Sequence, residues 1–226
     1  MPDFPQRRQS ARFLIQLPLL HRVGQSGSGK VGVGWSRNMG MGGACVELAE
    51  KLEEKIPLRV RLQTDQGPID VQSRVVWTEH TAPVGGGIRH GIAFIDVGPE
   101  QERDLQALLL SKGEVRQAGV RLPLEIAATC QYKSPGDPSP PAFQGQTGNL
   151  SRGGLLLRLP LRLTPDTLIE VTLHTSHGPL KAEGVVVWAD SGERRSSAEL
   201  IPHGLRFTTI GWSTTLSLGL VLAEPL

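Results

Sequence analysis

The sequence predicts an all-β protein built of two tandem, small six-stranded barrels, and three observations lead to this fold class. Glycine (27) and proline (17) are abundant among the 226 residues, which favours many turns and short strands over long helices. Between the turns, apolar residues alternate with glycine or polar residues at the period of a β-strand. Motifs of the first half recur in the second half, so the chain carries two copies of one domain.

Four motifs establish this repeat, because they occur twice in the same order and at nearly the same spacing. Three pairs lie 111 positions apart and the fourth lies 113 apart: Asn38–Gly43 with Asn149–Gly154, Thr64–Pro68 with Thr175–Pro179, Val75–Trp77 with Val186–Trp188, and His90–Phe94 with His203–Phe207. Each copy therefore spans about 110 residues, the size of a small domain. We place the first domain at residues 1–112 and the second at residues 117–226.

The strands follow from apolar stretches bounded by turn residues. In the first copy we expect strands at Phe13–Val23, Val31–Trp35, Ala44–Leu48, Leu58–Gln63, Ile69–Trp77 and Ile88–Ile95. In the second copy we expect them at Leu122–Thr129, Gly154–Leu159, Leu168–His174, Leu180–Trp188 and Gly204–Thr209. Short antiparallel strands in this number favour a closed barrel, which leaves no edge exposed.

One helix is expected, directly after the last strand of the first copy. Pro99 suits the first turn of a helix, and leucines recur at helical spacing from Leu105 until Gly113. We expect this helix to cap the first barrel. The corresponding end of the second copy, Trp212–Leu220, lacks such periodicity, and residues 133–147, with four prolines, are expected to form a loop.

Composition and charge exclude several classes of function. A formal net charge of +2 gives no reason to expect a nucleic-acid polymer as partner. We expect a cytoplasmic protein without membrane insertion, because no apolar stretch reaches the length of a membrane span and no secretory signal is recognisable. Cys45 and Cys130 lie far apart, as free thiols of a reducing compartment would, although a disulfide between them stays open. We find no motif for a metal site and no catalytic set, and therefore expect no enzyme.

The segment Gly24–Val31, GQSGSGKV, raises the question of a phosphate-binding loop. It fits the P-loop pattern as far as Lys30, but Val31 replaces the serine or threonine that would hold magnesium. A P-loop also needs a helix directly after it, whereas Val31–Trp35 alternates glycine with strand-forming residues. We interpret the segment as the tip of a hairpin and expect no nucleotide hydrolysis.

Two features carry the polar chemistry that remains. An arginine-rich segment precedes the first strand and contains Arg7, Arg8 and Arg12, the last two of which form an RxxxR motif. An Asn-x-(Gly or Ser)-x-x-Gly turn occurs in both copies. In this order and spacing, together with the Val-Val-Trp and His-Gly-x-x-Phe strands, they resemble the PilZ family, whose signature is RxxxR followed by [DN]xSxxG. The resemblance covers nearly the whole chain as a tandem pair.

The resemblance implies a binding site for the bacterial messenger cyclic di-GMP, with no cofactor. The first-choice site comprises Arg7, Arg8, Arg12, Asn38, Gly40 and Gly43, and the second-choice site comprises Arg116, Arg121, Asn149, Ser151 and Gly154. The first copy lacks the serine of the turn, whereas the second has Gln117 where the first arginine of the pair belongs. Because a charge-assisted hydrogen-bonding group contributes more than a neutral hydroxyl, we prefer the first copy.

The function that the resemblance implies is that of a non-enzymatic receptor or adaptor in motility or biofilm regulation. An arginine fork can pair bidentately with phosphate or with the edge of guanine, and a terminal arm becomes ordered when it does so. Binding would thereby relay the level of cyclic di-GMP to an unidentified effector protein. The alternative is a degenerate pair of barrels that binds no nucleotide and acts through protein contacts.

Overall fold

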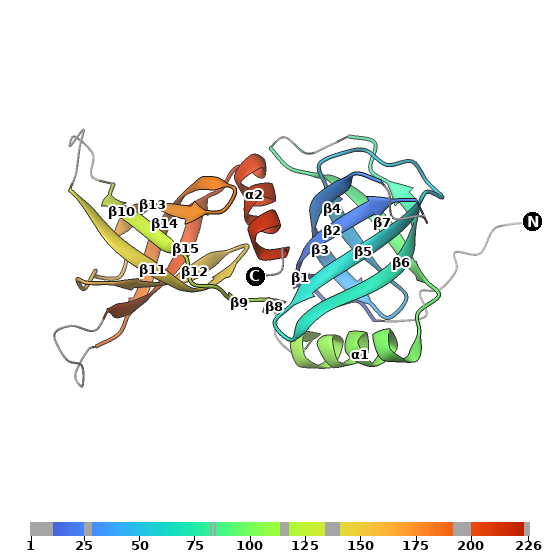
Figure 1. Cartoon of the computed structure of the whole chain (residues 1–226), viewed down its shortest axis with the longest axis horizontal. Coiled ribbons are helices and arrows are strands. Elements are labelled where there is room, and N and C mark those ends of the chain that lie inside the picture. The colour runs from blue at the N-terminus through green and yellow to red at the C-terminus, as the bar shows by residue number, and fades with distance from the viewer. Residues whose placement is uncertain are drawn as a thin grey trace, which may run out of the picture. The chain divides into compact units, whose positions relative to one another are not determined.

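The structure is a computed structural model, and it describes residues 11–24, 29–81, 83, 85–113, 118–133, 141–191 and 200–223. The chain divides into two compact units, Met1–Ala118 and Gly119–Leu226. Each unit contains a closed antiparallel β-barrel and an α-helix (Figure 1). The predicted fold class, two tandem barrels of six strands, is confirmed.

The first barrel closes through six strands in the order β2-β3-β4-β7-β6-β5. These are β2 (Pro18–Val23), β3 (Val31–Gly40), β4 (Gly43–Leu48), β5 (Pro57–Thr64), β6 (Gly67–Thr78) and β7 (Ile88–Ile95), preceded by the short β1 (Ile15–Gln16). Side chains alternate strictly along β5 and β6, so that Val60 and Val71 are buried while Arg59 and Gln72 are exposed. The barrel interior is therefore the core of this unit.

The predicted helix is α1 (Pro99–Gly113). Leu105, Leu108 and Leu109 are buried, as their helical spacing predicts. In Figure 1 this helix lies across one end of the first barrel, and its contacts are with β6. The expected capping of the first barrel is thus observed.

The second unit repeats the same connectivity. Its strands are β9 (Leu122–Pro123), β10 (Ala127–Tyr132), β11 (Ala142–Ser151), β12 (Gly154–Leu159), β13 (Leu168–Thr175), β14 (Gly178–Ala189) and β15 (Ile201–Thr209), and the two-residue β8 (Ala118–Gly119) lies at the boundary of the two units. The order β10-β13-β14-β15-β12-β11 closes because β10 also pairs with β11, and β9 is added beside β11. Strands β11 to β14 begin 111 positions after β3 to β6, so the sequence repeat is a structural repeat.

The loop predicted at residues 133–147 is wrong in its second half. Residues from Ala142 onward form β11, which pairs with β10 on one side and β12 on the other. The prolines, which cannot donate to a ladder, end at Pro141, and residues 134–140 lie outside the described part of the chain. The strand was missed because Gly145 and Gly148 interrupt its apolar pattern.

Two further predicted strands are each interrupted in the structure. Phe13–Val23 is divided into β1 and β2, and Leu122–Thr129 is divided into β9 and β10. In the first case Pro18 starts the barrel strand, a position that tolerates proline because its missing N–H is not needed there. The short strands before the breaks, β1 and β9, belong to the segments that enter each barrel after an arginine.

The second unit also ends in a helix, α2 (Trp212–Ala223), which the sequence did not lead us to expect. Its buried residues include Leu218 and Leu222, four positions apart on one face. Apolar residues also occupy most of the remaining positions from Leu216 to Leu222, so no polar face reveals the helical period. Like α1, it begins shortly after the last strand of its barrel, and it contacts β14.

Both cysteines are buried free thiols, so no disulfide joins Cys45 and Cys130. Burial raises the pKa of Cys130 to about 12, which keeps this thiol neutral. Among the described residues, no helix has the length and apolar character needed to cross a membrane.

Candidate functional site

The segment that follows the arginine arm is bonded to the strand that carries the asparagine. Phe13 and Met39 exchange two backbone hydrogen bonds, with N···O distances of 2.8 and 2.9 Å. Arg12 directly precedes Phe13 and Asn38 directly precedes Met39, so this antiparallel bridge brings the exposed Arg12 alongside the Asn38–Gly43 turn. Arg7 and Arg8 lie outside the described residues.

The second unit repeats this arrangement with a longer pairing. Leu122 and Pro123, which form β9, pair with Leu150 and Asn149 of β11. Arg121 directly precedes Leu122 and is exposed. The pairing of β9 with β11 therefore brings Arg121 beside the second turn. Arg116 and Gln117 lie outside the described residues, so the predicted contribution of Arg116 stays a prediction.

A buried hydroxyl anchors this entering segment in each unit, which sequence reasoning missed. Ser36 Oγ, on β3, accepts a hydrogen bond from Leu17 N (2.9 Å) and donates one to Ile15 O (2.6 Å). Ser36 is fully buried, so both bonds are sheltered from water. The bonds hold β1 and its continuation against β3, only a few residues after Arg12.

Thr147 has the same role at the equivalent position of β11. Its Oγ1 accepts from Ile126 N at 2.9 Å and donates to Leu124 O. These bonds fall at the break between β9 and β10, as those of Ser36 fall at the break between β1 and β2. The repeat offset of 111 pairs Ser36 with Thr147, which is the signal in the sequence that could have revealed the anchor.

The glycines that end the two turns are required by the barrel itself. A Cβ built on Gly43 would lie 2.2 Å from Ile92 O, and one built on Gly154 would lie 2.1 Å from Leu205 O. In both units the neighbouring strand approaches too closely for any side chain. We expected these glycines to admit a ligand, but the close approach of β7 or β15 already explains them.

The serine of the second turn is also engaged within the protein. Ser151 is buried, and its Oγ donates to Gly154 O at 2.9 Å, so it closes the turn. Gly40 takes its place in the first turn, where the backbone of Gly40 pairs with Gly43 without such a clasp. The hydroxyl that the first copy lacks is therefore a structural group in the second copy.

Asn38 has a buried hydrogen-bond acceptor without a donor among the described residues. Its side-chain oxygen Oδ1 is shielded from solvent and has no hydrogen-bond partner within the described part of the chain. A buried polar atom without a partner costs about 1–3 kcal/mol, and a bound water or ligand donor would remove this cost. Cys45 lies opposite Asn38 on β4, and burial raises the pKa of this thiol, so it adds no negative charge there.

A guanidinium that sequence reasoning missed lies next to Asn38. Arg37, the bulged residue of β3, contacts the buried carboxylate of Glu47 through Nη1 and Oε1 at 2.6 Å. Arg89 Nε approaches the same carboxylate oxygen at 3.9 Å. Arg89 Nη1 also lies 3.6 Å from Glu79 Oε1, so two arginines and two acids form one cluster here, in which Glu47 fixes the position of Arg37.

In the second unit a guanidinium occupies the same neighbourhood but comes from the adjacent strand. Gly148 replaces Arg37, and Arg158 of β12 replaces Glu47, at the offset of 111. The guanidinium of Arg158 lies over Gly148, because a Cβ built there would be 3.3 Å from its Cζ. Arg158 Nη1 also binds Glu125 Oε1 at 2.7 Å. Each turn therefore has an arginine beside its asparagine.

The residues directly after Lys30 test the P-loop interpretation. Val31 begins β3, and no helix starts there, so the predicted strand is confirmed and the helix dipole that a phosphate would need is missing. Residues 25–28 of the motif lie outside the described residues. His90 and His203, which we interpreted as structural, are buried, with both ring nitrogens bonded to backbone groups.

These observations define a class of protein with two small β-barrels. In each barrel, a segment that follows an arginine is hydrogen-bonded to the strand that leads into an asparagine–glycine turn. The PilZ domain family matches residues 6–111 and 115–212. The chain belongs to this family and contains two PilZ domains in tandem, as the resemblance in the sequence implied.

Three solved structures are similar to this chain. The PilZ domain with c-di-GMP of YcgR from Escherichia coli is 17% identical, with a TM-score of 0.41, over 47% of this chain and 91% of that chain. The Bacillus subtilis inhibitor of motility, MotI/DgrA, is 13% identical, with a TM-score of 0.39, over 92% and 94%. The Borreliella burgdorferi PlzA protein in complex with c-di-GMP is 12% identical, with a TM-score of 0.38, over 92% and 88%. No curated protein matches the chain significantly.

Proposed function

We propose that this tandem PilZ protein is a non-enzymatic receptor for cyclic di-GMP that binds its ligand at the first barrel. The observation that carries the proposal is the backbone bridge between Phe13 and Met39, which brings Arg12 beside the Asn38–Gly43 turn. This bridge supports the proposal because Arg12, the second arginine of the family signature, precedes a residue bonded to the strand that leads into the turn.

The chemistry of the turn suits a ligand with two phosphates and two guanines. Arg8 and Arg12 would supply planar forks for phosphate oxygens or for guanine O6 and N7. The unpartnered Oδ1 of Asn38 would accept from a guanine N–H or from an arginine of the arm. Arg37, held by Glu47, adds a third guanidinium whose position is fixed before the ligand arrives.

Binding would change the surface that the protein offers to a partner. The arm before Arg12 would be drawn onto the turn by the ligand, and this ordering is the signal that an effector protein reads. An arm that must be ordered costs part of the binding free energy, so the same step couples ligand level to partner affinity.

The direct test is a calorimetric titration of the full chain with cyclic di-GMP. We expect saturable binding, and we expect Arg8→Ala, Arg12→Ala and Asn38→Ala each to weaken it. Loss of one hydrogen-bonding group on a charged ligand costs about 1.5–3 kcal/mol, or about ten- to a hundredfold in Kd. Arg121→Ala and Asn149→Ala are the matched controls in the second barrel and should leave the first site intact.

Two results would contradict the proposal. If the titration shows no heat of binding at high micromolar cyclic di-GMP, the protein is not a receptor for this ligand. Binding that is lost in Asn149→Ala but kept in Arg8→Ala would move the site to the second barrel.

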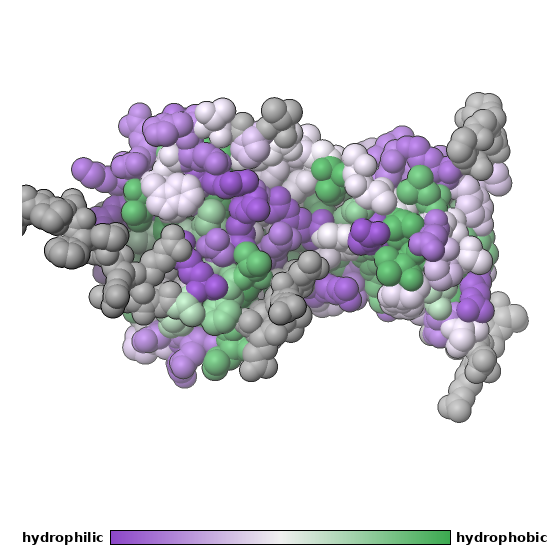
Figure 2. Space-filling view, turned by 180° about the vertical axis from the view of Figure 1, so that it is seen from behind, coloured by the Kyte–Doolittle hydropathy of each residue, from purple (hydrophilic) through white to green (hydrophobic). Residues whose placement is uncertain are grey.

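The second candidate function, an adaptor that acts through protein contacts alone, is favoured by one observation. Val76 and Val187, at equivalent positions of the two barrels, are 50% and 52% exposed, and each is followed by a half-exposed tryptophan. Figure 2 shows apolar side chains exposed among polar ones on both units. Exposed apolar residues of this size suit a protein interface. Partner capture that is independent of cyclic di-GMP and is lost in Val76→Ser would support this candidate.

A further inference from the structure

The first barrel contains a pocket that is separate from the turn. Its volume is about 430 Å³, within the range of small-molecule sites. Strands β2, β3, β5 and β6, the connection between β7 and α1, and the start of α1 supply its lining, which includes Arg22, Arg59, Arg61, Asp70 and Asp96. Neither Arg12 nor any residue of the Asn38–Gly43 turn belongs to this lining.

Three arginines gather on one wall of this pocket. Arg22 of β2 lies directly opposite Arg59 of β5 in the ladder, and Arg61 follows on the same face of β5. Like charges directly opposite each other on neighbouring strands destabilise a sheet. An anion bound beside the two guanidinium groups would offset this repulsion.

The arginines are not equivalent in their contacts. Arg61 is committed to Asp70 by two hydrogen bonds, Nε to Oδ1 at 2.9 Å and Nη2 to Oδ2 at 2.8 Å. Arg59 makes no hydrogen bond or ion pair with the residues that the structure describes. The guanidinium of Arg59, with the positive charge of Arg22 beside it, is therefore the group of this lining that is best suited to an anion.

The second barrel shows that the fold does not need these charges. At the offsets of the two strands, Gln131 and Glu170 stand where the first barrel has Arg22 and Arg59, and they pair with each other in the same register. Thr172 likewise replaces Arg61. Because the same barrel closes with neutral and acidic residues at these positions, the arginine wall is a property of the first barrel alone.

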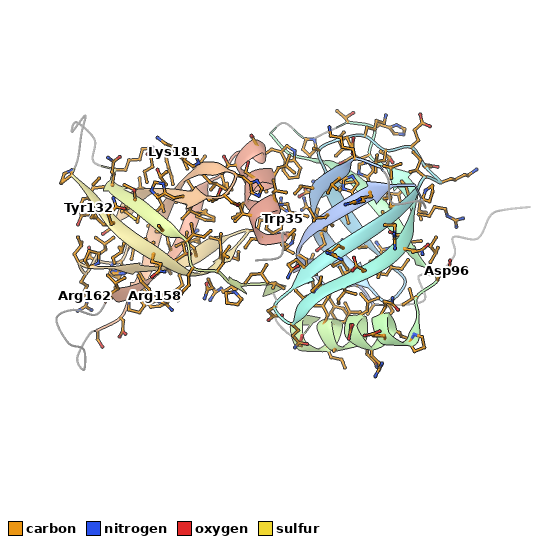
Figure 3. All side chains as sticks on the ribbon, viewed as in Figure 1. Trp35, Asp96, Tyr132, Arg158, Arg162 and Lys181 are labelled. Atoms are coloured by element: carbon orange, nitrogen blue, oxygen red, sulfur yellow. The ribbon has the colours of Figure 1, made fainter. Side chains whose placement is uncertain are left out.

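The lining also includes an acid, Asp96, whose backbone has a positive φ. Asp96 joins β7 to α1, as marked in Figure 3, and has φ = 52°, in the left-handed region. Aspartate adopts this left-handed conformation more readily than most residues other than glycine, so the backbone at this position suits an acidic side chain. Val31 and Val97 add apolar surface to the lining.

From this juxtaposition we propose that the pocket binds a guanine nucleoside mono- or diphosphate, at a site distinct from that of cyclic di-GMP. The phosphates bind Arg59 beside Arg22. The guanine lies against Val31 and Val97, and the carboxylate of Asp96 accepts hydrogen bonds from guanine N1–H and the 2-amino group. The site does not depend on the function proposed for the turn.

The test is a titration of the full chain with GDP, with ADP and inorganic pyrophosphate as comparison probes. We expect GDP to bind about tenfold or more tightly than either, since adenine offers Asp96 a single donor group and pyrophosphate none. Arg59→Glu should weaken GDP binding about ten- to a hundredfold or more, because it removes a charged hydrogen-bonding group. This variant introduces the residue type that Glu170 already represents in the second barrel, so we expect it to fold.

Three further variants separate the site from its surroundings. Asp96→Asn keeps a residue that tolerates a positive φ and should abolish the preference for GDP over ADP. Arg74→Ala, an exposed arginine of β6 outside the pocket, should bind GDP as the wild type does. Asn38→Ala should also retain GDP binding while it weakens binding of cyclic di-GMP.

Three outcomes would overturn the assignment. The first is the absence of saturable GDP binding at millimolar concentration. The second is GDP binding that Arg59→Glu leaves unchanged or that Asn38→Ala weakens equally. The third is equal affinity for pyrophosphate and GDP, which would show that the pocket does not recognise the guanine base. If cyclic di-GMP does not bind but GDP does, only the receptor function proposed above is contradicted.

Discussion

The indole of Trp77 lies directly over Gly91, its partner in the β6–β7 ladder, because a Cβ built on Gly91 would be only 2.0 Å from Trp77 Nε1. Trp188 and Gly204 repeat this contact at the same distance in the second barrel. Each pair sits at a β-bulge, and both tryptophans are half-exposed. The tryptophan and glycine motifs of the sequence are therefore two halves of one contact on the outside of each barrel.

This contact predicts that Gly91→Ala and Gly204→Ala destabilise their barrels. The added methyl group must displace the indole, and overpacking of this kind costs about 1–3 kcal/mol in the free energy of unfolding. Urea denaturation followed by tryptophan fluorescence measures the change. Gly42→Ala is the matched control, since its Cβ would meet nothing within 4 Å. Equal stability of Gly42→Ala and Gly91→Ala would show that the indole does not require the glycine.

The sequence predicted the strands and the repeat because those features depend on local patterns. Alternation along β5 and β6 reflects one buried face, and the recurring motifs fix the equivalence of the barrels. The helix α2 was missed because Leu218 and Leu222 lie among other apolar residues, so that no polar face marks the period. The first half of β11 was missed because its glycines break the alternation.

The candidate site was predicted only in part, because its parts are brought together by long-range contacts. The asparagine turn and the arginine arm could be identified as motifs. The anchor at Ser36 could not, since a lone serine in a strand has no local signature. Arg37 and Arg158 come from different strands, and only the paired register places both beside an asparagine. The roles of Gly43 and Gly154 required the position of the neighbouring strand.

The ion pair of Arg37 with Glu47 predicts a difference between the two barrels. Arg37→Ala leaves the buried Glu47 carboxylate with the longer contact to Arg89, and we expect a loss of about 1–3 kcal/mol in the free energy of unfolding. Arg158→Ala should cost only about 0–1 kcal/mol, because its partner Glu125 is largely exposed. Urea denaturation of both variants tests this, and Arg37→Ala combined with Glu47→Gln should recover part of the loss.

The buried histidines predict a loss of stability on acidification. His90 Nδ1 donates to Ile88 O and its Nε2 accepts from Leu52 N, so the ring is neutral, and His203 is bound in the same way. Burial lowers the pKa of both rings below the unfolded value of about 6.5. The unfolded chain therefore binds more protons below that pH, and stability present above it is lost as the pH falls.

This dependence can be measured by urea denaturation at about pH 7.5 and about pH 5.5, on either side of the unfolded pKa. The free energy of unfolding should be lower at the acidic pH. A double variant, His90→Gln with His203→Gln, should show a smaller difference between the two pH values. A wild-type stability that is constant or rises on acidification would contradict the neutral state of these rings.

The hydroxyl anchor predicts that Ser36 positions the ligand-binding arm as well as stabilising the barrel. Ser36→Ala leaves Leu17 N and Ile15 O without their buried partner, which costs about 1–3 kcal/mol in the free energy of unfolding. Because this partner holds the segment after Arg12 against β3, the variant should also weaken binding of cyclic di-GMP. Ser36→Thr should keep both the stability and the affinity for cyclic di-GMP near those of the wild type, since the second barrel has a threonine at this position.

Thr147→Val separates these two effects. It removes the same pair of hydrogen bonds, to Ile126 N and Leu124 O, with little change in shape, and should destabilise the chain by a similar amount. The anchor that it removes belongs to the second barrel, so affinity at the first turn should be unchanged. Calorimetry with cyclic di-GMP on both variants gives the comparison. If Ser36→Ala lowers stability but binds as tightly as Thr147→Val, the hydroxyl is only a structural group and the arm reaches the ligand without it.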